Sequence, residues 1–417
     1  MRKNKIDALY GILDQGLLSL TNLGIGLFLI NYTTKENYGL YGIGFAIVLF
    51  FVSVENGLIA TQMTVLAPEK AEREGGIDLY CLSMLYGQYY IFIPIWIVCQ
   101  ILAYILYYLK ILNPDVFLYQ IVISITVMTV LFHEFMRRYF FLKFNPRRVL
   151  MIDLVNIFFI VSALIITAKW DYEKPHILAI AIYGGGAIVA GMIGLLSSGL
   201  VGFVSKTKVL TSLKEAWDNG RWALGGVVVT WGQSQGYVLL LSILATAEAV
   251  AEANAARLFL APVNVISTSF IRVFMPKLIH LKNQQHHASV RIMARKILTV
   301  VITTIGIVVL GVIIMEDVII EFAFTEDYSN IDIFIIAWAV VVLFVAIRTN
   351  NTILLQVYRK FKDITLCNTI TTTITLLLGI VLIHYFGVLG SITALAIGEI
   401  LLSLFLWRRF SLVKKEM

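Results

Sequence analysis

Long runs of apolar residues recur along the whole chain, and they constrain its fold more than any other feature. Four examples are Ile91–Tyr108, Ile157–Ala168, Leu298–Met315 and Thr373–Phe386. A helix of about 20 apolar residues crosses the hydrocarbon core of a bilayer, where lipid offers the backbone no hydrogen-bond partner. The composition agrees, because 59% of the 417 residues are hydrophobic and 14% are charged, against about a quarter charged in soluble domains. The sequence therefore predicts an all-α membrane protein.

Read in order, the apolar runs predict about twelve transmembrane helices. Their expected ranges are residues 8–30, 39–65, 80–108, 115–136, 149–168, 177–203, 217–244, 253–276, 291–314, 331–357, 363–385 and 387–407. The first run is too long for a cleavable signal and is expected to remain as a helix. The longest polar connection, near Val204–Asp218, then divides the chain into a six-helix N-terminal lobe (1–205) and a six-helix C-terminal lobe (206–417).

Lys and Arg are distributed unevenly over the loops of this topology. The side that carries the N-terminus holds 26 of them, counting Arg137 as a loop residue just beyond the helix at 115–136, and the other side holds 4. Loops rich in Lys and Arg stay in the cytoplasm, so both termini are predicted to be cytoplasmic. The net charge of +7 is therefore a topology signal, and no nucleic-acid partner is expected.

A few charged residues fall inside the predicted helices, where each costs about 2.5–3.5 kcal/mol on insertion and needs a reason. The candidates are three carboxylates and three arginines: Asp14, Glu55, Glu399, Arg257, Arg272 and Arg348. No arginine is expected within the first six helices. Glu134 and Asp153 are expected near the cytoplasmic surface of the membrane.

Polar side chains accompany these charges along the same helices. They are Gln15, Asn22, Asn56, Gln62, Gln233, Asn264 and Asn351. One interpretation is that the ions pair and the polar groups bond between helices, which only holds the bundle together. The other is that they line a water-filled cavity, in which arginines form an anion site because their planar, always-charged fork suits phosphate. The pattern alone leaves both open.

Motifs of enzymes and of metal sites are absent from the sequence. There is no nucleotide-binding Walker A pattern, and no serine-hydrolase or zinc-protease motif. The three cysteines, Cys81, Cys99 and Cys367, are far apart and suggest neither disulfides nor zinc. His286 and His287 are adjacent in a polar loop, which is expected to be solvated rather than to bind a metal. Neither enzyme activity nor a cofactor is predicted.

Five short motifs spread over the chain carry a family resemblance. They are Glu36–Tyr41 (E-N-Y-G-L-Y), Ala255–Leu258 (A-A-R-L) followed by Pro262, Met275–Leu278 (M-P-K-L), Gln356–Lys360 (Q-V-Y-R-K) and Phe386–Gly390 (F-G-V-L-G). With these motifs, its length and its 6+6 topology, the chain resembles the Wzx-type flippases. These form the polysaccharide-transport branch of the multidrug/oligosaccharidyl-lipid/polysaccharide exporter superfamily.

The resemblance implies two six-helix bundles that form a V-shaped central cavity in the bacterial inner membrane. It also implies a substrate, an undecaprenyl-diphosphate-linked oligosaccharide such as an O-antigen or a related surface polysaccharide unit of lipopolysaccharide biosynthesis. Such a flippase moves its substrate from the cytoplasmic to the periplasmic leaflet by alternating access, without a cofactor. Membrane lipids are implied partners, and a polysaccharide polymerase and a chain-length regulator are left open as further ones.

The cavity interpretation, together with the resemblance, predicts roles for the polar residues. The family's cavity is commonly cationic, so the residues expected to bind diphosphate or glycan are Arg257, Arg272, Arg348, Asn264, Asn351 and Gln233. The carboxylates of Asp14, Glu55 and Glu399 are expected to act in coupling or gating. The remaining polar residues are expected to line the cavity: Gln15, Asn22, Asn56 and Gln62.

Three rival functions stay open. A cation-coupled multidrug exporter of the same superfamily would use Asp14 as its coupling carboxylate, but the arginines would repel cationic drugs. A glycan polymerase or ligase would need a large periplasmic loop, whereas the outer loops here are short. A sugar transporter of the major facilitator type would carry a basic Gly-Asp-Arg loop, where this chain has Glu69–Glu74 (E-K-A-E-R-E).

Overall fold

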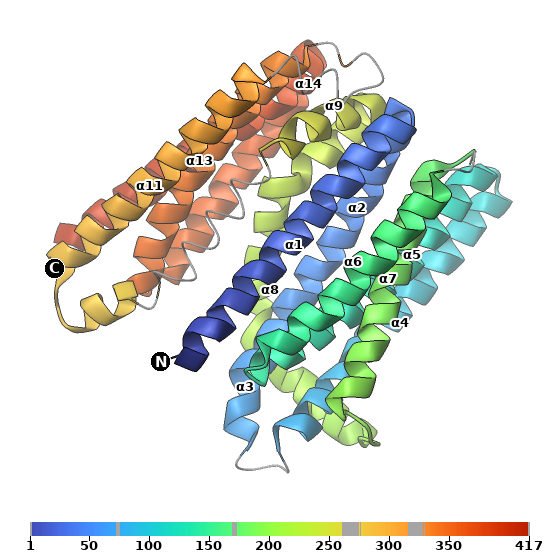
Figure 1. The fold of residues 1–417 in the computed structure, drawn as a ribbon, viewed down its shortest axis with the longest axis horizontal. Helices are drawn as coiled ribbons and strands as arrows, with labels where there is room; N and C mark the ends of the chain where they lie inside the picture. Colours follow the sequence, from blue (N-terminus) through green and yellow to red (C-terminus); the bar gives the residue numbers. More distant parts are fainter. Residues whose placement is uncertain are drawn as a thin grey trace. The chain divides into compact units, whose positions relative to one another are not determined.

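The computed structural model describes residues 2–71, 76–168, 173–260, 275, 277–315, 328 and 330–415. Over these residues the chain is helical and contains no strand (Figure 1). The helices are α1 (Arg2–Tyr32), α2 (Lys35–Glu55), α3 (Thr61–Ala71), α4 (Ile77–Tyr108), α5 (Pro114–Leu142), α6 (Pro146–Thr167), α7 (Pro175–Ser198), α8 (Lys206–Leu244), α9 (Ala247–Leu258), α11 (His287–Ile314), α13 (Ile331–Val357) and α14 (Phe361–Lys415). Ten helical segments of the described chain are long and apolar enough to cross a membrane.

The long helix α14 supplies two of the predicted crossings. Its 55 residues reverse direction at Gly387, where φ is 53° and ψ is −126°, a conformation that glycine adopts readily. A side chain at Gly390 would collide with the carbonyl of Leu382, so the tight reversal also requires glycine there. The predicted helices 363–385 and 387–407 are therefore confirmed as the two halves of α14.

The remaining ranges agree with prediction apart from their ends. The predicted helix 253–276 begins in α9, and its continuation lies outside the described residues. The predicted helix 39–65 is longer and is interrupted by a π-helical turn at Asn56–Ala60, which joins α2 to α3. One of the ten apolar segments is α14, which contains two crossings. The described helices therefore agree with a count of about twelve.

Local sequence explains where several helices begin. Asn113 precedes Pro114, and its side-chain oxygen accepts a hydrogen bond from the amide of Val116 at 2.8 Å. Asn145 and Pro146 repeat the arrangement at the start of α6. An Asn cap satisfies an otherwise unpaired amide, and proline tolerates the first helical position because its missing N–H would be unpaired there anyway.

The contacts of the chain define two compact units. Unit 1 comprises Met1–Leu18 and Gly44–Val228, and unit 2 comprises Ser19–Ile43 and Val229–Met417. The core of unit 1 includes the fully buried Met63 and Phe135, and that of unit 2 includes Leu355. The predicted division into two six-helix lobes at 205/206 stays a prediction.

The orientation of the chain in the membrane gives a first testable expectation. A reporter fused after Lys415 should be active only if that reporter works in the cytoplasm, because the uneven distribution of Lys and Arg places the C-terminus there. Paired fusions of alkaline phosphatase and green fluorescent protein measure this directly. Phosphatase activity with a dark fluorescent fusion would reverse the topology.

Candidate functional site

A buried cluster of charges joins three helices of unit 1 around Arg137. The guanidinium of Arg137, in α5, lies 3.1 Å from a carboxylate oxygen of Asp14 in α1 and 2.8 Å from one of Asp153 in α6. It also lies 2.7 Å from the carboxylate of Glu134, one turn away on its own helix. The side chains of Asp14 and Asp153 are 2% and 1% exposed. Three acids therefore share one guanidinium.

His133 adds a fifth ionisable group to this Arg137 cluster. Its Nε2 lies 3.0 Å from the second carboxylate oxygen of Asp153, and the imidazole is buried. Oδ1 of Asp14 is buried and has no donor among the described residues, and the carboxylates of Asp14 and Asp153 lie close enough to interact. Three carboxylates thus face one permanent positive charge and one imidazole. Because unbalanced charge is costly in low dielectric, the cluster is suited to take up a proton.

The Arg137 cluster corrects two sequence expectations. Arg137 was expected in a cytoplasmic loop, and no arginine was expected in the first six helices. The helix α5 continues to Leu142, however, so Arg137 is part of it. Asp153 is buried among protein side chains, and its expected position near the membrane surface stays a prediction. Ion pairing is the physical reason, since each carboxylate compensates for the removal of the guanidinium from water. The spacing of His133, Glu134 and Arg137 on one helix face was the signal available in the sequence.

Glu55 is a second buried carboxylate of unit 1, at the end of α2. It is 1% exposed, and its Oε1 has no hydrogen-bond partner among the described residues. The π-helical turn begins at the next residue, Asn56, which is half-buried. Gln62 spans the turn, since its amide nitrogen lies 3.3 Å from the carbonyl oxygen of Gly57. Single π turns often mark functional positions, and a buried carboxylate with no described ion-pair partner is suited to carry a proton.

These acids give a prediction that separates function from packing. Glu55→Gln and Asp14→Asn should leave protein levels close to wild type, because each keeps the size of the side chain and removes a buried charge. If the two acids carry protons during transport, both variants should show a changed pH dependence of transport in reconstituted vesicles. Unaltered pH profiles in both variants would mean that the two acids are structural.

In unit 2, Glu399 forms the centre of a polar cluster. Its carboxylate lies 2.7 Å from the guanidinium of Arg348, in α13. The amide nitrogen of Gln233, in α8, lies 3.3 Å from the other carboxylate oxygen. The carbonyl oxygen of Gln233 accepts hydrogen bonds from the hydroxyls of Thr372 and Thr375 at 3.0 and 3.5 Å. The structure thus brings three predicted site residues together and holds them with the threonines of α14.

Arg257 has a different environment within unit 2. Its guanidinium donates to the Tyr237 hydroxyl at 3.0 Å and to the Gln235 side-chain oxygen at 3.5 Å. It also lies 5.4 Å from the ring centre of Trp338 and 5.8 Å from that of Tyr237. No carboxylate in the described part of the chain lies within ion-pair distance of it. Neutral acceptors and aromatic faces therefore hold a positive charge that no described carboxylate pairs with.

The other predicted site residues have separate locations. The amide of Asn351 is buried and donates to the carbonyl of Ser403 at 3.1 Å, so it ties α13 to α14. In α1, Gln15 is half-buried and Asn22 is exposed. Arg272 and Asn264 lie outside the described residues.

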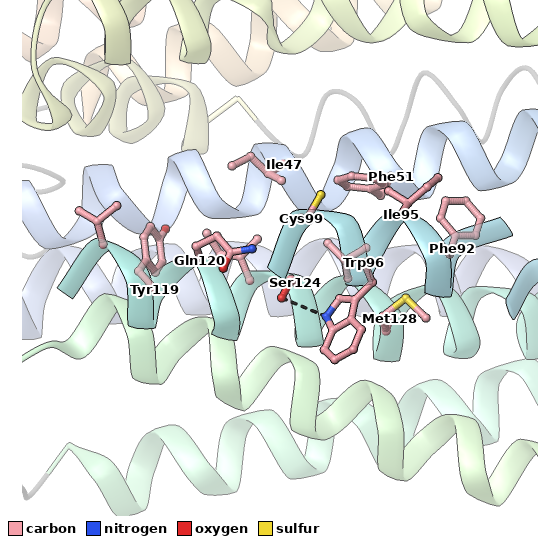
Figure 2. A pocket seen from close by; sticks show the side chains of 13 residues that line it. Ile47, Phe51, Phe92, Ile95, Trp96, Cys99, Tyr119, Gln120, Ser124 and Met128 are labelled. Atoms are coloured by element: carbon pink, nitrogen blue, oxygen red, sulfur yellow. Dashed lines mark hydrogen bonds between the residues drawn. The ribbon is translucent and has the colours of Figure 1, made fainter. Parts of the chain in front are cut away.

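An apolar pocket of unit 1 is shown in Figure 2. It is a cavity of about 350 Å³ between α2, α4 and α5. The indole N–H of Trp96 donates to the Ser124 hydroxyl at 3.2 Å, and that hydroxyl in turn donates to the carbonyl of Ile121 at 2.8 Å. None of the predicted site residues lines the pocket, and its described lining contains no cation. It suits hydrocarbon rather than a diphosphate.

The histidine doublet does not form a metal site with its neighbours in the described chain. Nδ1 of His287 lies 2.9 Å from the Tyr358 hydroxyl. Over the described ranges, no group of three or more His, Cys, Asp or Glu side chains is arranged to hold a metal ion.

Several solved structures of transporters are similar in fold to this chain. An inward-facing multidrug resistance MATE family transporter of the MOP superfamily aligns with a TM-score of 0.74 and 12% identity, over 96% of each chain. The lipid II flippase MurJ, in an inward closed conformation, aligns with a TM-score of 0.75 and 15% identity, over 96% of this chain and 86% of its own. A MOP superfamily transporter from Pyrococcus furiosus, described by the reverse polarity of its binding pocket, aligns with a TM-score of 0.64 and 12% identity, over 98% of this chain and 95% of its own.

Comparison by sequence adds nothing further to this likeness. No protein-family model matches the chain, and no curated protein matches it. At 12–15% identity the structural likeness establishes the fold. The chain therefore has the all-helical transporter fold that MATE family transporters and the lipid II flippase MurJ share.

Proposed function

We propose that this chain is a flippase that moves an undecaprenyl-diphosphate-linked oligosaccharide from the cytoplasmic to the periplasmic leaflet by alternating access. The glycan belongs to a surface polysaccharide such as an O-antigen, as the family resemblance implies. The fold supports the proposal, because one of the similar structures is a lipid II flippase. The arginines of unit 2 support the choice of an anionic headgroup.

Arg257 is the observation that carries this proposal. It keeps a permanent charge within a predicted membrane-spanning helix, and its described partners are the neutral side chains of Tyr237 and Gln235. A purely structural arginine in the membrane would be expected to pair with a carboxylate. The planar fork of an arginine that no described carboxylate pairs with matches the phosphate oxygens of a diphosphate.

Arg348 adds a switchable contact to the same proposal. In this structure its guanidinium is occupied by Glu399 at 2.7 Å. An incoming diphosphate would displace the carboxylate, which would then be left in low dielectric and would take up a proton. A substrate shifts a transporter between states only through its different affinity for them. We propose that the exchange of Glu399 for diphosphate at Arg348 supplies this difference in affinity.

The two carboxylate sites of unit 1 would couple the cycle to an ion gradient. No nucleotide-binding motif is present in the sequence, so the work must come from a gradient or from removal of product outside. Asp14 is held by Arg137, and Glu55 lacks a described partner at Oε1. Protonation of either acid would change the buried charge of unit 1 and bias it towards one state.

A cation-coupled multidrug exporter is the second candidate function. The Arg137 cluster favours it, because three carboxylates outnumber the one guanidinium. Similar folds include MATE family multidrug transporters. Under this alternative the substrate would be an organic cation, and the arginines of unit 2 would hold the bundle together.

Reconstituted vesicles distinguish the two functions with one preparation. Purified full-length protein is placed in liposomes, and translocation of a fluorescent undecaprenyl-diphosphate oligosaccharide is compared with uptake of the cationic dye ethidium. Protein-free liposomes give the background, and Arg147→Gln, at an exposed residue with no described ion pair, serves as the matched control. We expect the lipid-linked sugar to be moved and ethidium uptake to stay at background. Ethidium uptake without sugar movement would establish the exporter instead.

A further inference from the structure

A groove at the open end of the α14 hairpin combines arginines with hydrocarbon. The two halves of α14 run back past each other, so that Asp363 near its start lies 3.9 Å from Arg409 near its end. A cavity of about 330 Å³ opens between these halves. We call it the α14 groove, and it is separate from the clusters around Glu399 and Arg257.

The lining of the α14 groove divides into a charged mouth and an apolar floor. Arg408 and Arg409 supply the charge, and the side chain of Arg409 is 44% exposed. The apolar floor is formed mainly by Leu366, Ile370 and Phe405, of which the first two are exposed beside the cavity. Exposed apolar residues are ordinary where a helix meets lipid, but here two arginines line the same cavity as these apolar side chains.

The sequence of α14 places the groove at the end of an apolar span. The apolar span of α14 runs from Phe361 to Leu412, so Arg408 and Arg409 fall in its last turns, where we expect the lipid headgroups. Trp407, beside them, is 60% exposed, and tryptophan favours this interfacial depth. The cavity therefore spans the boundary between headgroups and acyl chains.

The charge balance selects an anionic occupant. Asp363 is the one acid within ion-pair range of these arginines in the described chain, and at 3.9 Å its contact with Arg409 is long. Arg408 has no described ion pair. Basic pockets between membrane helices recognise the phosphates of anionic lipids, and each guanidinium can hold two phosphate oxygens.

We propose that the α14 groove binds an anionic glycerophospholipid of the surrounding leaflet. The phosphate contacts Arg408 and Arg409, and one acyl chain lies along Leu366, Ile370 and Phe405. The bound lipid ties the two halves of α14 together at their open end. This role is independent of the substrate that the protein transports.

Lipid binding to the purified full-length protein tests the proposal. Native mass spectrometry gives the apparent dissociation constant of dioleoyl phosphatidylglycerol for wild type, for the double variant Arg408→Gln with Arg409→Gln, and for the control Arg147→Gln with Arg295→Gln. The control removes two exposed arginines that have no described ion pair. We expect about 30-fold weaker binding in the first variant, which corresponds to two cations at a membrane surface, and less than about twofold change in the control.

Three outcomes would overturn the proposal. Equal loss in both double variants would mean that scattered surface charge attracts the lipid. Displacement of phosphatidylglycerol by an equal concentration of inorganic phosphate would mean that the apolar floor takes no part. Preferential binding of undecaprenyl phosphate would assign the groove to a polyprenyl lipid. In support, Ile370→Trp, which fills the floor, should weaken phosphatidylglycerol binding without changing the arginines.

Discussion

Replacing Arg137 by Gln should remove most of the folded protein from the membrane. The substitution leaves Asp14, Glu134 and Asp153 without the guanidinium that all three contact. Breaking a buried ion pair from one side costs about 3–5 kcal/mol, which is a large part of the stability of an ordinary domain. The measurement is the thermal stability and the yield of the purified variant, with Arg147→Gln as the control for losing an exposed arginine.

A compensated variant shows whether Arg137 matters only for stability. Combining Arg137→Gln with Asp14→Asn and Asp153→Asn removes one positive and two negative charges, so the protein should recover most of its yield. If the cluster couples transport to an ion gradient, the recovered protein should still fail to respond to that gradient. Recovery of yield together with full gradient-driven transport would make the cluster purely structural. A stable Arg137→Gln single variant would contradict the energetic argument itself.

Substitutions of Arg257 and Arg348 should have the second largest effect, and on transport rather than on folding. Removing a hydrogen bond to a charged group costs about 1.5–3 kcal/mol, so Arg257→Ala should lower transport by about tenfold to a hundredfold. Arg257→Lys should be less damaging, because lysine keeps the charge but loses the bidentate fork. Surface glycan, measured in cells that depend on the variant, gives the readout. Wild-type glycan levels in the Ala variants of both arginines would contradict the proposal that they bind the diphosphate.

Arg348 needs a paired control because of Glu399. Arg348→Ala alone leaves a 3% exposed carboxylate without its ion-pair partner, so lost transport could reflect lost stability. The double variant Arg348→Ala with Glu399→Gln removes both charges and should restore protein levels. We expect transport to remain impaired in it. Restored transport would show that the pair only holds α13 to α14.

Much of the fold follows from the sequence because hydrocarbon allows few choices. Apolar runs of spanning length must be helices in lipid, so helix number and order could be predicted, including the reversal at Gly387. Helix ends were less predictable. Whether Arg137 belongs to a helix depends on how far α5 continues beyond its apolar run. The apolar run alone predicts that the helix ends at residue 136, one residue before Arg137.

The candidate site was predictable residue by residue but not as contacts. Asp14 and Glu399 stand out in the sequence because a charge in an apolar run costs free energy on insertion into the membrane. Their partners, however, come from other helices. The pairs Asp14–Arg137 and Arg348–Glu399 join residues 123 and 51 positions apart, and no local pattern indicates such pairing. The contacts of Tyr237 and Trp338 with Arg257 could not be predicted either, because aromatic residues are common in the packing of membrane helices.

The account rests centrally on Arg257 as a ligand for diphosphate, and binding of undecaprenyl diphosphate without any sugar tests this most directly. The measurement is its dissociation constant for purified wild type, Arg257→Lys and Arg257→Ala, with Arg147→Gln as the control. The account predicts about tenfold to a hundredfold weaker binding for the Ala variant, an intermediate value for Lys, and no change in the control. Equal affinity in wild type and Arg257→Ala, with both proteins folded, would contradict it.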